Sequence, residues 1–333
     1  MPLKNYGVLR GSVIDHRLAS GVNAHFQLHV VAGMTHYRIA INVESQQQPS
    51  ELEYLIDSDY SHPVLVEVAS LPEGWDELES KAGGAALDFI RGNLFDREGL
   101  RRLPFDVPGP DNDLNEKLAH YVRRAQADEQ ATVFAFGERW GPEKGKADKI
   151  FGFEPGNGVH DIHMNQANSG RFRGDDGVWQ DGALLLQFPG ERQQWVAVFL
   201  KFQSQIWHTD DATGHQIAGA PGAAIAEPDG TVRIVAALVN ALQSPETEFV
   251  TLLNTTAAAI DLEGWTLADR DKHMMALGGE IAAGETLRVQ LSPQVTLPNG
   301  GGVVTLLDAA GLKADGVAYT SERAGEPGRT LAF

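Results

Sequence analysis

The chain has 333 residues, more than one ordinary hydrophobic core accommodates, and this length fits two domains. A hydrophobic content of 42% and a charged content of 22% are typical of globular proteins and argue against disorder of the whole chain. The absence of cysteine excludes disulfides, thiolate nucleophiles and cysteine-ligated zinc, and a formal net charge of −18 disfavours bulk binding of nucleic acid or anionic membrane.

No segment predicts export or membrane insertion. The first residues lack a basic stretch followed by an apolar one, the pattern of a signal peptide. The longest apolar runs have the length of a strand, far short of the ~20 residues that a membrane helix needs. We therefore expect a soluble, cytoplasmic protein with no membrane partner.

Alternating apolar and polar residues predict strands through the first 70 residues. Within the second of them, His25, Gln27 and His29 share the polar face. Two histidines on such a face are either metal ligands or solvent-facing residues, and the pattern favours solvent-facing residues. The stretch His62–Leu71 is predicted as a further strand, so that a small barrel or sandwich opens the protein.

Later segments complete the N-terminal domain. Asp113 and Glu116 form a capping box that predicts the start of a helix. Continuous apolar runs near residues 183–188 and 194–203 predict buried central strands. Residues 218–230 are rich in alanine, glycine and proline and are predicted to link two domains. The predicted fold class is mainly β with a few helices, an α+β domain over 1–217 followed by a second domain over 231–333.

Short strands and turns follow one another closely from Thr231 onward, the pattern of a β-sandwich. Five motifs occur in order: EFVTLLN (248–254), LEGWTL (262–267), AGETL (283–287), VTLLD (304–308) and GVAY (316–319). In this order they resemble the lamin tail domain. The resemblance implies an immunoglobulin-like β-sandwich that serves binding or localisation, with Trp265 in its core. Asp269, Asp271 and His273 are expected in a solvated edge loop, in preference to a metal site.

Segments such as LDFIRGNLFD, FAFGERWGPE, PGNGVHDIHMNQ and FQSQIWHTDDATGH extend over almost all of residues 6–217. Together they resemble the YukJ-like family of bacterial proteins. The resemblance implies a compact domain to which a lamin-tail-like domain can be appended. It implies no reaction and assigns no catalytic residue.

Histidines and aspartates gather in two segments, 158–168 and 203–215. If the first segment is a strand from Val159 to Gln166, Asp161 and His163 share its polar face. His160 then lies on the opposite, apolar face, in the core or behind the metal ligands. The second segment follows a predicted buried strand, a position where rigid scaffolds often carry functional side chains. Docking the segments would gather imidazoles and carboxylates suited to a divalent metal ion. The expected ligands are His163, His208, Asp210, Asp211 and His215.

A bound divalent ion lowers the pKa of a coordinated water, which is the usual basis of metal-assisted hydrolysis. Glu138 is the expected general base, and Lys149 is expected to neutralise an anionic substrate, with Arg171 or Arg173 as alternatives. Asp161 completes the expected catalytic set.

Two functions stay open. The first is a metal-dependent hydrolase, a phosphodiesterase or nuclease, whose C-terminal domain binds an unidentified protein or an anionic substrate. The second is a non-catalytic binding or scaffolding protein, in which the histidine–aspartate cluster satisfies buried backbone groups and caps turns. The sequence contains no HExxH motif, no serine-nucleophile elbow and no dinucleotide fingerprint, which disfavours the chemistries that those motifs serve.

Overall fold

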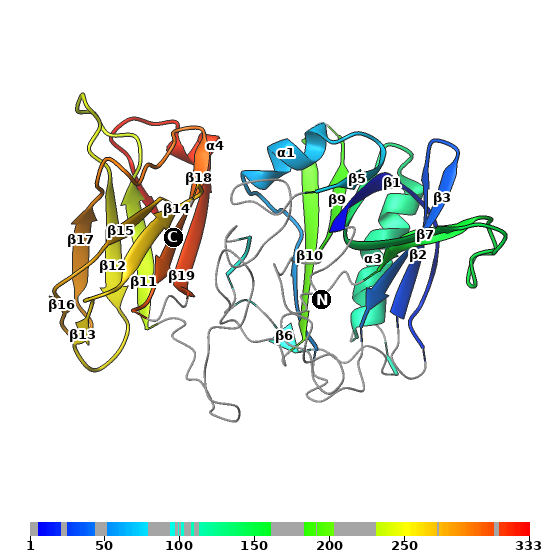
Figure 1. Cartoon of the computed structure of the whole chain (residues 1–333), viewed down its shortest axis with the longest axis horizontal. Helices are drawn as coiled ribbons and strands as arrows, with labels where there is room; N and C mark the ends of the chain where they lie inside the picture. The colour runs from blue at the N-terminus through cyan, green and yellow to red at the C-terminus, as the bar shows by residue number, and fades with distance from the viewer. Residues whose placement is uncertain are drawn as a thin grey trace.

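The computed structural model describes residues 6–20, 25–43, 52–78, 94–96, 99, 101–102, 108–109, 113–160, 183–190, 192–202, 231–271, 273–309 and 313–333. Strands dominate this part of the chain, with few helices (Figure 1), which confirms the predicted fold class. No helix within these ranges combines the length and apolar character needed to cross a membrane.

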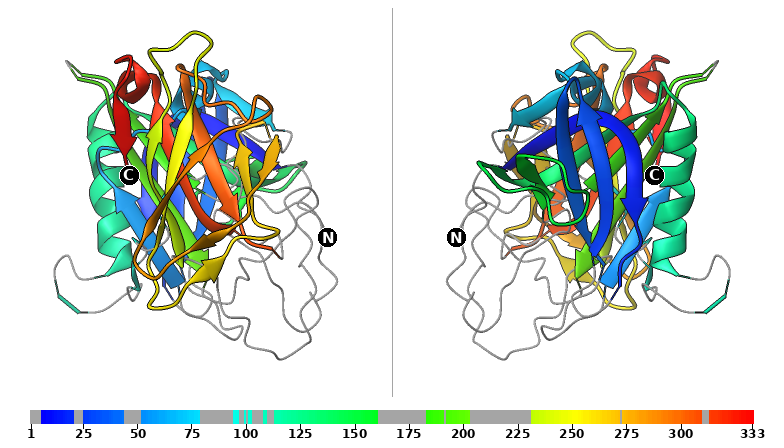
Figure 2. Two further views of the ribbon diagram at one scale, coloured as in Figure 1. Left: turned by 90° about the vertical axis from the view of Figure 1, so that its left-hand side faces the viewer. Right: turned by 90° about the vertical axis from the view of Figure 1, so that its right-hand side faces the viewer.

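Five strands close into a barrel in the N-terminal half of the chain (Figure 2). They are β1 (Tyr6–Arg17), β2 (His25–Ala32), β3 (Thr35–Asn42), β7 (Thr132–Glu143) and β8 (Gly156–His160). Hydrogen bonds join them in the order β1-β2-β3-β8-β7 and back to β1, and only β3 and β8 run parallel. The first half of β1 pairs with β7 and the second half pairs with β2, so this strand closes the barrel.

Helix α3 (Leu114–Ala127) lies between β3 and β7 in the sequence and contributes to the barrel core. The Asp113 side chain caps it by accepting a hydrogen bond from the Glu116 amide at 2.8 Å, which confirms the predicted start. The Asn115 side chain ties the helix to the end of β1, since its oxygen accepts from the Ala19 amide and its nitrogen donates to the Ala19 carbonyl. This strand order, with a helix between the third and fourth strands, is that of the five-stranded Greek-key barrel called the OB-fold.

Alternation along each strand separates the inside of the barrel from its outer face. On β2, Phe26, Leu28 and Val30 are fully buried, whereas the histidines and the glutamine between them are only half-buried. A Cβ atom on Gly158 would collide with the Arg38 carbonyl oxygen and the Trp140 ring, so glycine permits the close approach of β3 and β8.

The barrel sheet continues beyond β7. The strands β9 (Ala183–Phe188), β10 (Gln194–Phe202), β4 (Leu52–Asp57) and β6 (Arg101–Arg102) follow β7 in that order, and β5 (Gly74–Glu77) pairs with β1. The described residues of β9 are almost completely buried, as are those of β10 up to Leu200. Both predicted buried strands are therefore confirmed.

The strand predicted over His62–Leu71 is wrong, because this segment contains helix α1 (Val64–Ser70). Its buried residues, Val64, Leu65 and Val68, follow helical spacing, and Val66 between them is 78% exposed. His62 contributes to the helix start, since its Nδ1 accepts a hydrogen bond from the Val64 amide at 3.1 Å. Three β-branched valines at every second position imitate the alternation of a strand. Packing of one helix face against the core decides the structure instead.

The C-terminal residues form an immunoglobulin-like sandwich, as predicted. One sheet has the order β17 (Thr286–Gln290), β12 (Phe249–Asn254), β11 (Val232–Leu238) and β20 (Thr330–Ala332). The other has the order β15 (Met274–Ala276), β14 (Thr266–Asp269), β18 (Gly301–Leu307) and β19 (Lys313–Thr320). Strands β13 (Ile260–Asp261) and β16 (Glu280–Ile281) form a separate pair, and α4 (Ser321–Ala324) follows β19. Both sheets contribute to one core, which includes Trp265.

Among the described residues, two ion pairs join the N-terminal and C-terminal parts. Arg270 follows β14, and its Nη2 lies 3.2 Å from Oε1 of Glu67 in α1. Nη2 of Arg233 in β11 lies 3.2 Å from Oδ2 of Asp96. Helix α1 accordingly lies beside β18 and α4 (Figure 1). The linker predicted over 218–230 falls outside the described ranges.

Candidate functional site

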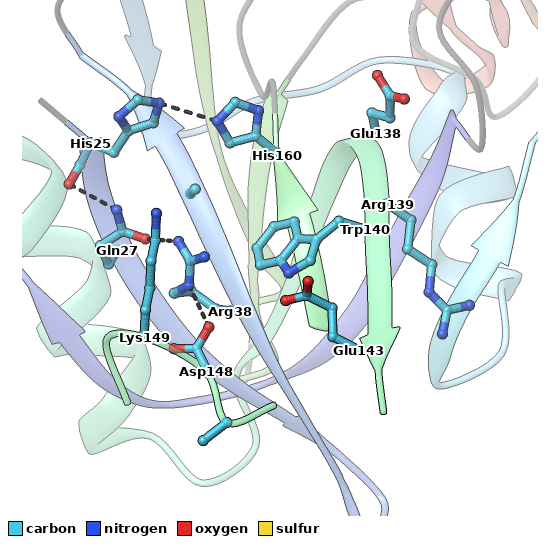
Figure 3. A pocket seen from close by; sticks show the side chains of 12 residues that line it. His25, Gln27, Arg38, Glu138, Arg139, Trp140, Glu143, Asp148, Lys149 and His160 are labelled. Carbon is cyan, nitrogen blue, oxygen red and sulfur yellow. Dashed lines mark hydrogen bonds and ion pairs between the residues drawn. The ribbon is translucent and has the colours of Figure 1, made fainter. Parts of the chain in front are cut away.

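A cavity of about 500 Å³ lies on the outer face of the barrel (Figure 3). Its lining comes from β2, β3, β7 and β8 and from the loop that joins β7 to β8. In the five-stranded Greek-key barrel, the outer face of the second and third strands and the loop between the last two strands bind oligonucleotides and oligosaccharides. The cavity therefore occupies the ligand-binding position of this architecture.

A buried ion pair between Arg38 and Asp148 organises the cavity. Arg38 Nε lies 2.7 Å from Asp148 Oδ2, and its Nη1 donates to the Gln27 side-chain oxygen at 2.8 Å. The guanidinium also lies over the Trp140 ring, 4.6 Å from its centre. The four side chains in contact come from four different elements. Their contacts therefore join β2, β3, β7 and the loop into one rigid wall of the cavity.

Asp148 also shapes the loop itself. Its second oxygen accepts hydrogen bonds from the amides of Ile150 and Phe151 at 3.0 and 2.9 Å. Burial raises the pKa of this carboxyl, but the hydrogen bonds from Phe151, Arg38 and Ile150 outweigh burial and hold the pKa below its usual value. Asp148 is therefore a structural anion.

Two histidines face each other in the same cavity. His25 on β2 and His160 at the end of β8 bring their Nε2 atoms to 3.2 Å from each other. The Trp140 and His160 rings meet edge to face, with 6.5 Å between ring centres. Glu138 of β7 pairs with His160 in the register of the sheet and lines the cavity too.

The prediction that His160 faces the core is wrong. Strand β8 ends at His160, and Val159 is the residue that points into the barrel, with no exposed surface. His160 therefore falls on the outer face and lies half-buried in the cavity. The prediction followed the apolar Ile162 and Met164, which lie outside the described residues, whereas the barrel core fixes the face of each residue in β8.

A second histidine pair lies farther along β2 and β3. His29 Nε2 is 2.8 Å from His36 Nδ1, and the His29 ring packs against Phe151 and Phe153, with centres 4.8 and 4.9 Å apart. Burial and the neighbouring His36 lower the pKa of His29. His25 and His29 were expected to face solvent, but both are half-buried among rings.

The structure brings two of the expected catalytic residues to one place. Glu138 and Lys149 both line the cavity with the histidine pair (Figure 3). Among the residues that the structure describes, no group of three or more histidines and carboxylates is placed to hold a metal ion. The remaining candidates lie outside the described residues: Asp161, His163, Arg171, Arg173, His208, Asp210, Asp211 and His215.

The sequence offered His25 as a metal ligand or a solvent-facing residue and favoured the latter, and it gave no indication of Arg38 and Asp148 as site residues. The alternation of β2 placed His25 on the outer face, and that signal was available. The contribution of Arg38 and Asp148 had no local signal, because these residues are 110 positions apart and meet only when the barrel closes.

In the C-terminal part, the loop after β14 depends on Asp269, which is buried rather than solvated as expected. Its oxygens accept hydrogen bonds from the amides of Asp271, His273 and Thr296, and one lies 3.0 Å from His273 Nδ1. Asp269 therefore holds the loop together, and these contacts explain its burial without a metal ion.

Comparison with known proteins accounts for both parts of the chain. Residues 1–214 match the family described as "Uncharacterized conserved protein (DUF2278)", and residues 226–321 match the Lamin Tail Domain. The "Uncharacterized protein YukJ" of Bacillus subtilis (strain 168) is 44% identical over 215 residues, which cover 63% of this chain and 93% of that protein. Both resemblances noted in the sequence are confirmed.

Proposed function

The chain belongs to the uncharacterized conserved protein family DUF2278, and we propose that the barrel within this family region is a metal-dependent hydrolase of phosphodiesters. The observation that carries the proposal is the shared cavity of Glu138, Lys149, His25 and His160. It unites a carboxylate base, an ammonium group and two imidazoles, the side chains that metal-assisted hydrolysis of an anionic ester requires.

Each group has a distinct role in this proposal. Glu138 removes a proton from the attacking water, and Lys149 neutralises charge on the phosphodiester. The metal ligands predicted from the sequence, His163, His208, Asp210, Asp211 and His215, stay part of the proposal. The position of the cavity on the oligonucleotide-binding face of the architecture makes single-stranded nucleic acid the first substrate to examine.

The net charge of −18 limits the electrostatic share of binding. Lys149 and the paired Arg38 face two carboxylates, Glu138 and Glu143, around the same cavity. Recognition in this proposal rests on ring stacking and hydrogen bonds, and affinity for an oligonucleotide should fall only shallowly with salt. The lamin-tail-like domain would bind a protein or the anionic substrate, and a cytoplasmic location is part of the proposal.

The test uses untagged full-length protein and bis(4-nitrophenyl) phosphate, with Mn²⁺, Zn²⁺ or Mg²⁺ added in turn. We expect hydrolysis that a chelator abolishes. Glu138→Gln should lower kcat about 10²- to 10⁴-fold, the usual contribution of a general base. The control Glu129→Gln changes an exposed residue in the turn after α3 and should leave kcat unchanged. His163→Ala and Asp210→Ala should lose metal and activity while keeping the fold.

Binding without catalysis is the second candidate function. The observation that favours it is the mutual satisfaction of Arg38, Asp148, Gln27 and Trp140, which builds a rigid wall without any reactive group. Saturable binding of a single-stranded oligonucleotide, with no turnover under any of the three metals, would establish this function in place of hydrolysis.

A further inference from the structure

The distance between the Nε2 atoms of His25 and His160 fits two ligands of one metal ion. Metal–nitrogen bonds of 2.0–2.1 Å at a tetrahedral angle place two ligating nitrogens about 3.3 Å apart. The observed separation of the two Nε2 atoms is 3.2 Å. We infer that His25 and His160 bind a divalent ion of the zinc type in the cavity on the outer face of the barrel.

The ring centres provide a second measure. If each metal–nitrogen bond is extended about 1.2 Å to the centre of its ring, the two centres should lie about 5.3 Å apart. A head-on hydrogen bond between the same nitrogens would separate the centres by about 5.6 Å. The observed separation is 5.2 Å, close to the value for two ligands of one ion.

The other histidine pair shows the contrast. His29 and His36 bring their nearest nitrogens to 2.8 Å, the length of an ordinary hydrogen bond and shorter than a tetrahedral ion allows. The His29 ring also packs between Phe151 and Phe153. This pair is therefore an internal comparison with the same kind of side chains, one of which also comes from β2.

His25 and His160 both line the cavity. The Gln27 side chain donates to the backbone carbonyl of His25 at 3.3 Å, and the Trp140 and His160 rings meet edge to face. Neutral imidazoles favour zinc and its transition-metal neighbours over magnesium, which prefers oxygen ligands. The remaining positions around the ion would go to water or to substrate. The inference rests on geometry alone and holds even if the protein hydrolyses nothing.

The experiment titrates Zn²⁺ into untagged, chelator-treated, full-length protein by isothermal titration calorimetry, with the melting temperature measured in parallel. Wild-type protein should bind one zinc ion per chain at this pair and melt at a higher temperature with zinc than without it. His25→Ala and His160→Ala should each weaken zinc binding at least about 100-fold. His25→Gln and His160→Gln keep more of the side chain and should give the same loss.

The matched controls are His29→Ala and His36→Ala, which should keep zinc affinity within about threefold of wild type. Circular dichroism confirms the fold of each variant before titration. The inference is overturned if wild-type protein binds no zinc, or if folded His25 and His160 variants bind it as tightly as wild type. It is also overturned if the His29 and His36 variants alone lose it.

Discussion

At the scale of single residues, the site depends on charges that are buried and matched. Arg38 and Asp148 retain only 9% and 2% of their side-chain surface, so that neither charge has much access to water. A buried pair stabilises little in itself, but loss of one partner leaves the other charge without compensation. Substitution of either Arg38 or Asp148 alone should therefore destabilise the wall of the cavity.

Asp148→Ala should lower the free energy of unfolding by about 3–5 kcal/mol, because Arg38 would stay buried without its carboxylate. The double variant Arg38→Met/Asp148→Leu should lose less than the single variants Arg38→Met and Asp148→Leu together, and wild type completes this set of four. Chemical denaturation of the four proteins measures this coupling. As a control, Asp15→Ala removes an exposed partner of Arg17 and should cost less than about 1 kcal/mol. Additive effects at Arg38 and Asp148 would contradict the coupling.

The buried carboxyl of Glu248 should make the stability of the sandwich depend on pH. Burial, with a smaller contribution from Glu246, raises its pKa from 4.5 to about 7, although the Leu297 amide opposes the rise. The folded state then binds a proton more tightly than the unfolded state, so stability falls as pH rises from about 4.5 to about 7. Glu248→Gln should stabilise the sandwich by about 1–2 kcal/mol at about pH 8, after allowance for solvent screening, and should change little near pH 4.5. Thermal melts at both pH values test this, and an equal shift at both would contradict it.

At the scale of elements, sequence periodicity succeeded where one face of a strand is buried. The alternation of β2 correctly separated its core residues from His25 and Gln27. It failed for α1, where valine spacing imitates a strand, and for His160, where flanking residues were given more weight than the core. The parallel contact between β3 and β8 joins Ile39 to Val159, and no local pattern specifies a pairing across 120 residues.

That contact makes Gly158 a sensitive position. Gly158→Ala should destabilise the protein by about 1–3 kcal/mol or more, because the added Cβ meets the Arg38 carbonyl and the Trp140 ring. Gly190→Ala is the control, since its added Cβ would meet no atom closer than 3.8 Å. Denaturant midpoints compare the two variants, and equal midpoints would show that β3 and β8 tolerate a wider separation.

At the scale of the whole molecule, the sequence predicted the fold class and both family resemblances, together with two residues of the cavity, Glu138 and Lys149. It left open whether a small barrel or a sandwich opens the protein, because closure of the barrel depends on contacts between distant strands. The closed barrel is also what brings His25 of β2 to His160 of β8, 135 positions later. The candidate site is therefore a product of topology, and its chemistry depends on what those two imidazoles hold.

Crystals of the untagged protein grown with Zn²⁺ and measured at the zinc absorption edge test the metal centre most directly. The account predicts one anomalous peak about 2.0–2.1 Å from both the His25 Nε2 and the His160 Nε2 atoms. The absence of a peak between these rings, or a peak between His29 and His36 instead, would contradict it.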